Sequence, residues 1–478
     1  MTRQYQLACA LLESGWHRDV GVAVDDRGYI VRIDTGGTPT APTAPTAPAA
    51  PAAPAAVERV AGFVVPGMAN AHSHAFQRGM AGNTEYRLSA RDSFWTWRQA
   101  MYALANRITP PDLEIIATQL FVEMLKAGYT SVAEFHYLHR QPDGAPYAAT
   151  NELWRAVASA ADTAGIALTF LPTLYQTSDF GSQPLKPEQA RFAMTTDEFL
   201  RAIETRVSAE RQAPSGRLRT GAAFHSLRAV PLETLREAVA GLHSIDPGMP
   251  VHIHIAEQLK EVEACRASTG RRPIELLLET GMVGALWCLV HATHATPAEL
   301  QGIAAAGAAV CVSISTEANL GDGFFDAARF LGLQGRVCVG SDSQATVCPA
   351  EELRWMEYQA RLRKRRRGVL AESGEPHVGT RLWRAAARQG AAALAQPAGA
   401  LAEGARADWL VLDAEHASMA GARADTALDH LIFSGGSAAI RDVMVGGTWV
   451  VKERRHAAEE RIAGPFRELM AELALGRG

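Results

Sequence analysis

The chain has 478 residues, of which 47% are hydrophobic, and this size suits a large barrel with a second, smaller domain. Its 47 lysines and arginines nearly balance 51 aspartates and glutamates, so the formal charge of −4 gives no overall field that attracts nucleic acid or an anionic membrane. With no run of about 20 apolar residues, no signal-peptide core and six scattered cysteines without a C-x-x-C motif, the sequence predicts a cytoplasmic protein with reduced thiols.

The first elements along the chain are two short strands within residues 18–34, joined by a turn at Asp26-Arg27-Gly28. A low-complexity tract of Ala, Pro and Thr follows over residues 38–56. Such a composition cannot pack into a core, so we expect an exposed, mobile, polyproline-like excursion without an assigned function.

From residue 62 onward, apolar strand-like runs alternate with helical patterns, several of which end at a glycine. The eight runs span residues 62–74, 129–137, 166–175, 219–228, 250–257, 287–293, 308–315 and 336–343. Eight such units with continuously apolar strands predict a closed parallel (β/α)8 barrel of the α/β class. An open doubly wound sheet is the alternative, but no glycine-rich phosphate loop marks its usual ligand site.

Two further strand patterns follow the barrel, at residues 407–413 and 440–453, and the chain closes with an amphipathic helix. Chain termini often lie close together, so we expect these strands to join the N-terminal ones in a small β-sandwich. The predicted division is residues 1–61 and 399–478 for this sandwich and residues 62–398 for the barrel.

His72 and His74 lie one residue apart after an apolar run, so both imidazoles point from one face of a strand toward the same point. The working residues of a parallel barrel lie at the C-terminal ends of its strands. Reading the other polar residues there adds Tyr137, Arg228, His254, Glu257, His291 and Asp342. Histidines and a carboxylate that converge at the C-terminal end of one barrel form a ligand set that zinc accepts, with a coordination position left for water.

Each of these residues also has a purely structural interpretation. His252 and His254 share a strand face, so either is the ligand and the other a core residue, and the strand end favours His254. Asp342 or Glu257 can instead cap the helix that follows. An unpaired carboxylate after an apolar strand is costly, which favours a metal or histidine partner for Asp342.

Taken together, the H-x-H pair, His254 with Glu257, His291 and the Ser-Asp pair of the eighth run resemble the amidohydrolase superfamily of metal-dependent hydrolases. The resemblance covers nearly the whole chain and implies a (β/α)8 barrel with an attached β-sandwich. No lysine ends the fourth run, where AAFHSLRAV stands. This departure argues against the branch with a carboxylated lysine and two metals, and for one metal ion.

Finer motifs are similar to the branch of the superfamily that deiminates N-formimino-L-glutamate in histidine degradation: AHSHAFQRGMAG, FWTWRQAMY, EFHYLH, HSLRAV, HIHIAEQ, TEANLGDG and GSDSQ. The resemblance implies one Zn²⁺ per chain, with iron or manganese as alternatives, and a homodimer. The implied metal ligands are His72, His74, His254 and Asp342. The implied catalytic residues are Glu257, His291 and Asp342, and the implied substrate-binding residues are Gln77, Arg98, Tyr137 and Arg228.

The arginines give a separate reason to expect a dianionic small-molecule substrate, because a guanidinium matches a carboxylate in a two-point fork. Without the resemblance, the structural alternative for Arg98 is an ordinary charged residue on the protein surface. Competing functions are deamination of a guanine-like or cytosine-like ring and a non-catalytic barrel scaffold. The basic run at residues 361–368 is read as a solvated helix face rather than a nucleic-acid site.

Overall fold

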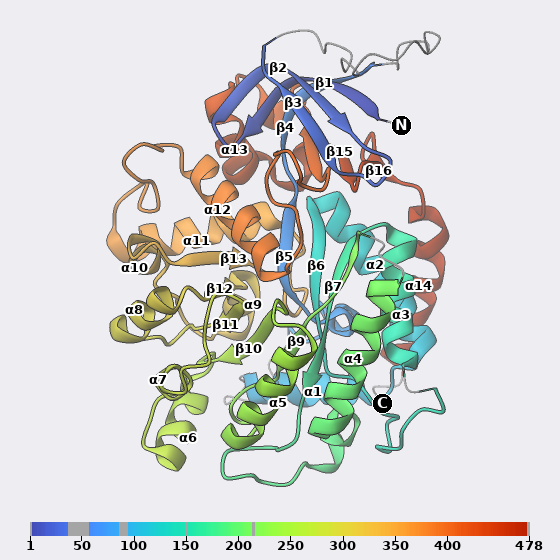
Figure 1. Ribbon diagram of the computed structural model, residues 1–478, viewed down its shortest axis with the longest axis vertical. Helices are drawn as coiled ribbons and strands as arrows, with labels where there is room; N and C mark the ends of the chain where they lie inside the picture. Colours follow the sequence, from blue (N-terminus) through green and yellow to red (C-terminus); the bar gives the residue numbers. More distant parts are fainter. Residues whose placement is uncertain (1, 37–56, 86–93, 150, 213–215, 476–478) are drawn as a thin grey trace.

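Two β-sheets organise the chain, a barrel of parallel strands and a sheet built from both ends of the sequence (Figure 1). The computed structural model describes residues 2–36, 57–85, 94–149, 151–212 and 216–475. The Ala/Pro/Thr tract of residues 38–56 lies outside these ranges. No helix within them is long and apolar enough to cross a membrane.

The predicted parallel barrel is confirmed. Its strands are β5 (Met68–Ser73), β6 (Tyr129–His136), β7 (Ala167–Leu174), β9 (Ala222–Phe224), β10 (Val251–Ile255), β11 (Trp287–His291), β12 (Ala309–Val312) and β13 (Arg336–Val339). Each strand pairs with the next in parallel, and a parallel bridge between Ser73 and Asp342 brings the two edges of the sheet together. This closure places the end of the first strand beside the end of the eighth.

The fourth strand is much shorter than the predicted run of residues 219–228. It consists of β8 (Leu218–Thr220) and β9, which are separated by Gly221. A Cβ atom at Gly221 would lie 2.5 Å from Leu171 Cδ2 and 2.9 Å from Pro250 Cγ, so the chain needs glycine there. Residues 225–228 leave the strand and form the loop that carries His225 and Arg228.

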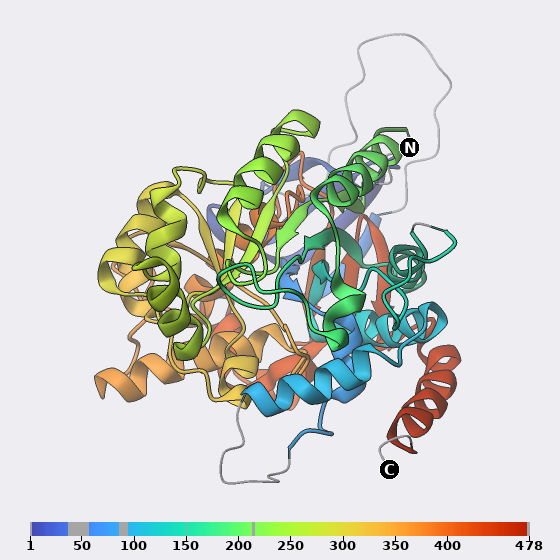
Figure 2. The ribbon, with the colours of Figure 1, turned by 90° about the horizontal axis from the view of Figure 1, so that it is seen from below.

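Helices surround the barrel, as Figure 2 shows from below. The α-helices of the described chain are α1 (Phe94–Ala105), α2 (Pro110–Ala127), α3 (Glu152–Ala164), α4 (Thr196–Gln212), α5 (Leu232–Ile245), α6 (Leu259–Thr269), α7 (Pro273–Glu279), α8 (Pro297–Ala306), α9 (Ile314–Leu320), α10 (Ala327–Gly332), α11 (Pro349–Lys364), α12 (Val378–Ala393), α13 (Ala427–His430) and α14 (Glu459–Leu475). Local sequence sets their ends: α2 starts with a capping box between Thr109 and Asp112 and ends at Gly128, whose φ is +106°. The basic run only partly continues α11, which ends at Lys364.

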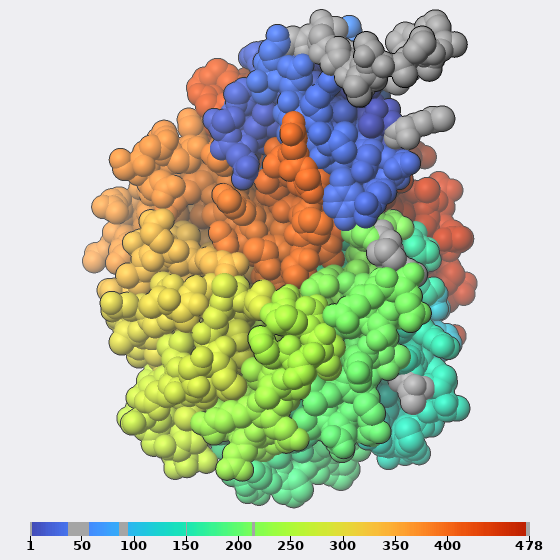
Figure 3. Space-filling view, in the orientation of Figure 1, coloured from blue at the N-terminus to red at the C-terminus, as the bar shows by residue number. Residues whose placement is uncertain are grey.

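The second sheet contains β1 (Arg3–Leu12), β2 (Gly15–Val24), β3 (Ile30–Asp34), β4 (Val57–Pro66), β14 (Trp409–Leu412), β15 (Ile440–Val445), β16 (Thr448–Lys452) and β17 (Arg455–His456). Their order is β17-β16-β15-β14-β4-β1-β2-β3, so strands from both chain ends pair along β4 and β14, as predicted. Figure 3 shows these N-terminal and C-terminal segments side by side in blue and orange.

This sheet has an apolar core of its own, in which the rings of Tyr5 and Trp409 meet edge to face at 5.3 Å. β4 leads almost directly into β5, with only Gly67 between them. The sheet therefore joins the barrel at the N-terminal end of its first strand, and the strand ends that carry the candidate site point the other way.

Candidate active site

Barrel closure brings Asp342 to the two histidines of β5. The carbonyl oxygen of His72 accepts hydrogen bonds from the backbone N–H groups of Ser341 and Asp342, and the His74 N–H donates to the Asp342 carbonyl. Gly340 makes this approach possible, since a Cβ atom there would lie 2.8 Å from His72 Cβ and 2.9 Å from its carbonyl oxygen. Asn70 adds a side-chain link, donating to Ser341 Oγ at 2.7 Å.

Four side-chain atoms converge between these strands and β10: the Nε2 atoms of His72, His74 and His254 and the Oδ1 atom of Asp342. His254 Nε2 lies 3.0 Å from His72 Nε2 and 3.3 Å from His74 Nε2. Asp342 Oδ1 lies 3.4 Å from His72 Nε2 and 3.5 Å from His74 Nε2. Tetrahedral zinc with bonds of about 2.0–2.1 Å separates its ligand atoms by about 3.4 Å, which matches this spacing.

The hydrogen bonds of the histidines fix which nitrogen atoms can bind a cation. His74 Nδ1 donates to the Phe135 carbonyl at 2.8 Å, and His254 Nδ1 donates to the His225 carbonyl at 2.9 Å. Burial lowers the pKa of both imidazoles, so they are neutral and their Nε2 atoms carry lone pairs. Two lone pairs facing each other at 3.3 Å repel unless a cation lies between them, so the residues present fit a metal ion.

The protonation states of His72 and Asp342 also fit a metal site. Burial lowers the pKa of His72 to about 3. Burial raises the pKa of the Asp342 carboxyl, but His72, His291 and His74 lower it more, so Asp342 stays ionised. Three neutral imidazoles and one carboxylate form a donor set that zinc, iron or manganese accepts.

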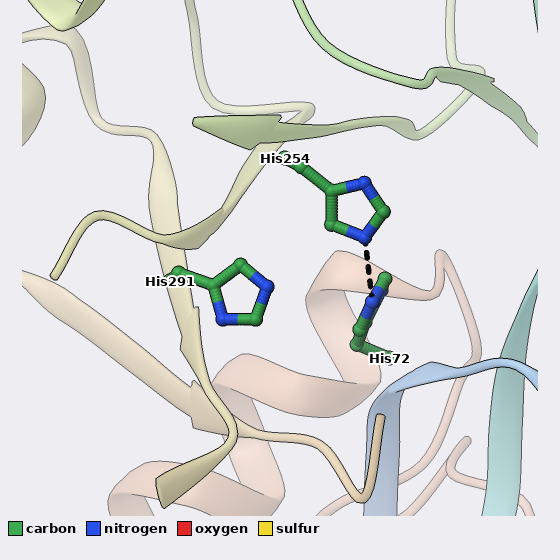
Figure 4. A group of neighbouring side chains, drawn as sticks. All are labelled: His72, His254 and His291. Carbon is green, nitrogen blue, oxygen red and sulfur yellow. Dashed lines mark hydrogen bonds between the residues drawn. The ribbon is translucent and has the colours of Figure 1, made fainter. Parts of the chain in front are cut away.

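His291, at the end of β11, lies beside this cluster, and Figure 4 shows its ring near those of His72 and His254. Its Nε2 atom is 3.7 Å from both Glu257 Oε1 and Asp342 Oδ2, and its Nδ1 atom is 3.3 Å from Glu317 Oε1. Burial lowers the pKa of His291, but Glu257, Glu317 and Asp342 together raise it to about 10. Burial raises the pKa of Glu257. These groups can therefore hold and exchange a proton close to the metal ligands.

The backbone is strained where these side chains leave their strands. His291 has a φ of +73° and Asp342 a φ of +47°, and Ala256, just before Glu257, has a φ of +51°. Residues other than glycine rarely adopt this left-handed region, and such outliers concentrate at functional sites. The Glu261 carboxylate holds the Glu257 loop by accepting the N–H groups of Ala256 and Glu257, each at 3.1 Å.

His252 occupies a different place from His254, although the two share a strand face. Its Nε2 atom bonds to the Ala393 carbonyl at 2.9 Å, outside the cluster. Of the two candidates on β10, only His254 faces the other histidines.

The predicted substrate-binding residues line one pocket with the histidine cluster. Arg98, on α1, is only 9% exposed, and its guanidinium carbon lies 4.8 Å from the ring centroid of Trp95 and 5.2 Å from that of Tyr102. Its Nε and Nη1 atoms have no hydrogen-bond partner within the described part of the chain. The alternative that Arg98 is a surface charge is therefore wrong.

Three further predicted residues line the same pocket. Arg228 lines the pocket from the loop after β9, and its Nη1 atom donates to the Ser178 carbonyl at 3.3 Å. Gln77 donates through Nε2 to the Tyr137 hydroxyl at 2.8 Å, which leaves its buried Oε1 without a partner among the described residues. The guanidinium groups of Arg98 and Arg228 and the side-chain amide of Gln77 thus lie near the histidine cluster in one pocket.

Several residues of the site did not emerge from the sequence. His225 lies in the quoted motif HSLRAV and lines the pocket, and its carbonyl orients His254. Glu317 follows Thr316 in TEANLGDG, but nothing in that spacing pointed to a carboxylate beside His291. Tyr102 and Tyr175 also line the pocket. These positions follow from packing between distant segments.

Comparison with known proteins agrees with this geometry. The profile of the Amidohydrolase family matches residues 63–450. The chain belongs to this family. The metal-dependent hydrolase barrel and the candidate His/Asp site agree with this assignment.

Individual relatives cover almost the whole amidohydrolase chain. It is 47% identical over 464 residues to formimidoylglutamate deiminase of Pseudomonas aeruginosa, covering 97% of this chain and 98% of that one. It is 25% identical to a 5-methylthioadenosine/S-adenosylhomocysteine deaminase of Natronomonas pharaonis, over 82% of each chain. The crystal structure of an amidohydrolase from Brucella melitensis superimposes with a TM-score of 0.89 at 40% identity, covering 99% of this chain and 100% of that one.

Proposed function

We propose that the chain is a zinc-dependent deiminase that hydrolyses N-formimino-L-glutamate to N-formyl-L-glutamate and ammonia in histidine degradation. The observation that carries this proposal is the presence of two arginines, Arg98 and Arg228, in the same pocket as a His/Asp cluster. The substrate has two carboxylates and one hydrolysable C=N bond, so the pocket offers a partner for each part. The 47% identity to formimidoylglutamate deiminase supports the same substrate.

His72, His74, His254 and Asp342 would hold one Zn²⁺ ion, and the same donors also accept iron or manganese. When bound, the metal supplies Lewis acidity and lowers the pKa of water to about 7, which makes a nucleophile available at neutral pH. The spacing of the four donor atoms, 3.0 to 3.5 Å for the pairs given above, supports a single small cation.

The residues beside the ligands would move the protons. Asp342 Oδ2 would accept the proton of the attacking water, while His291 Nε2, 3.7 Å from it, would orient that water. Glu257 would carry a proton to the imine nitrogen, because burial raises its pKa and lets its carboxyl hold a proton near neutral pH. The protonated nitrogen then leaves as ammonia when the C–N bond breaks, and the C=O bond of the formyl product forms.

Arg98 and Arg228 would each pair with a carboxylate of the substrate, and Gln77 and Tyr137 would bind its polar groups beside the formimino carbon. The buried, unpartnered Oε1 of Gln77 can accept a hydrogen bond from a substrate N–H. The aromatic residues of α1 would exclude water from this region.

The test is product analysis with purified protein. N-formimino-L-glutamate should yield equal amounts of ammonia and N-formyl-L-glutamate, while guanine, cytosine and 5-methylthioadenosine should yield no ammonia. Turnover of a ring substrate instead would favour the competing deaminase function, which the relationship to the 5-methylthioadenosine/S-adenosylhomocysteine deaminase raises. Protein that binds no metal and turns over none of these compounds would favour the scaffold.

We also propose a cytoplasmic homodimer that acts on a small molecule and binds no nucleic acid. Light scattering coupled to size exclusion should give twice the chain mass of 51.3 kDa. A mass of one chain would refute the dimer without affecting the proposed reaction.

A further inference from the structure

Gln189 is a fully buried glutamine behind the wall of the pocket, with 0% of its surface exposed. It lies in the short 3-10 helix η2 (Pro187–Phe192), between β7 and α4. Its Nε2 atom is 2.7 Å from the Tyr175 hydroxyl and 3.1 Å from the Tyr102 hydroxyl. Gln189 therefore joins two pocket tyrosines that come from different parts of the barrel.

The orientation of this amide is fixed by a backbone group. The N–H of Lys186 can only donate, and it lies 3.0 Å from Gln189 Oε1, so the oxygen atom must face Lys186. The NH₂ group consequently faces the tyrosines. Because an amide nitrogen donates two hydrogen bonds and accepts none, both phenol oxygens act as acceptors toward Gln189.

Each phenol must then direct its own hydrogen away from Gln189. Both rings line the pocket that holds Arg98 and Arg228, and Tyr102 is the ring 5.2 Å from the Arg98 guanidinium. Arginine is a donor without acceptor capacity, so neither guanidinium can accept a phenol hydrogen. A group that satisfies the tyrosines and the arginines together has to be rich in acceptors and negatively charged, as a carboxylate is.

The two tyrosines and the η2 segment also interact with Arg228 and with the helix that carries Arg98. Arg228 makes a side-chain hydrogen bond to Tyr175, and although burial lowers the pKa of Arg228, Tyr175 and Tyr102 raise it overall. The η2 segment also contacts α1, the helix that carries Arg98, because Arg191 donates to the Ala105 carbonyl and Asn106 donates to the Glu188 carbonyl at 3.0 Å.

We propose that Gln189 is a positioning residue that turns the Tyr102 and Tyr175 hydroxyls into hydrogen-bond donors toward the carboxylates of the substrate, next to Arg98 and Arg228. This inference rests on the proposed deiminase function, since it takes the dianionic substrate as given. Gln189 itself touches no substrate; the tyrosines do.

The first experiment compares Gln189→Leu with the unaltered enzyme on two substrates, N-formimino-L-glutamate and an N-alkylformamidine without carboxylates. Loss of two oriented hydrogen bonds should lower kcat/KM on the dianionic substrate by about tenfold or more, mainly through KM. On the carboxylate-free substrate kcat/KM should change less than about threefold. Equal losses on both substrates would overturn the proposal. If the unaltered enzyme does not turn over N-formimino-L-glutamate, the proposed function has failed instead.

A second experiment asks whether Gln189 acts through the tyrosines. In a Tyr102→Phe, Tyr175→Phe background, adding Gln189→Leu should change kcat/KM less than about threefold, because no hydroxyl remains to orient. Retention of the full effect there would refute the proposed route. If Gln189→Leu does not fold, the single tyrosine variants take its place, and each should raise KM for the dianionic substrate alone; unchanged KM values would overturn the proposal.

A matched control is Gln396→Leu. Gln396 is also a buried glutamine, 7% exposed, but it bonds to Thr169 Oγ1 and Arg406, away from the pocket. This variant should lower the melting temperature and leave KM unchanged. A rise in KM equal to that of Gln189→Leu would show that loss of any buried amide has this effect, and would overturn the positioning role.

Discussion

Replacing Arg228 by Met should separate substrate recognition from chemistry. Methionine keeps much of the length of the arginine stem and removes the guanidinium, together with its 3.3 Å bond to the Ser178 carbonyl and its side-chain hydrogen bond to Tyr175. Hydrogen bonds to charged groups contribute about 1.5–3 kcal/mol each. A two-point contact with one carboxylate therefore contributes about 3–6 kcal/mol, and at about 1.4 kcal/mol per decade kcat/KM should fall by at least about 100-fold.

The assay is steady-state ammonia release from N-formimino-L-glutamate and from an N-alkylformamidine that lacks carboxylates. We expect the loss on the first substrate only, since the second presents no group to Arg228. Arg201→Met, which removes an exposed arginine on α4 outside the active-site pocket, is the control and should match the unaltered enzyme on both. Equal losses on the two substrates for Arg228→Met would refute its role as a carboxylate partner.

Three further changes test other parts of the account. Glu257→Gln should lower kcat by about 10²–10⁴ with zinc retained, because the amide cannot transfer a proton, and near-normal kcat would remove Glu257 from the reaction. Gly340→Ala should lower the free energy of unfolding by about 1–3 kcal/mol and reduce zinc content measured by atomic absorption, since its methyl group would press on His72; unchanged zinc content would contradict the tight closure. Arg406→Met should destabilise the fold by about 3–5 kcal/mol in urea titrations, because it leaves the buried Asp408 carboxylate without its partner at 2.6 Å, while kcat/KM of the folded enzyme stays unchanged. An unchanged midpoint would show that this ion pair is not needed for stability.

The barrel and the core of the site were predictable because their signals are local. Alternation along a strand puts His72 and His74 on one face, and the rule that strand ends converge adds His254, His291 and Asp342 without any knowledge of the packing. The pairing of strands from both chain ends followed from the strand patterns together with the tendency of chain termini to lie close together, although the structure forms one eight-stranded sheet rather than the predicted sandwich.

Residues that depend on distant segments were not predictable in the same way. Glu317 reaches His291 from α9, and Gln189 reaches Tyr102 across 87 positions of sequence, so neither has a periodic or spacing signal. Arg98 was ambiguous for a different reason: Trp95 and Tyr102 flank it on its own helix, but the local sequence does not show that this face of the helix lines the pocket. The fourth strand is interrupted at Gly221, where a Cβ atom has no room, and it ends at Phe224 because residues 225–228 form a loop. The apolar pattern of residues 219–228 indicates neither feature.

The central claim is that a metal held by the His/Asp cluster drives hydrolysis of N-formimino-L-glutamate. The most direct measurement is ammonia release from this substrate by purified protein, before chelation, after chelation and during stepwise return of Zn²⁺. We expect activity to vanish with the metal and to return in proportion to zinc, reaching its maximum at one ion per chain. Full activity in the metal-free protein, or zinc binding at one ion per chain without any turnover, would contradict the account.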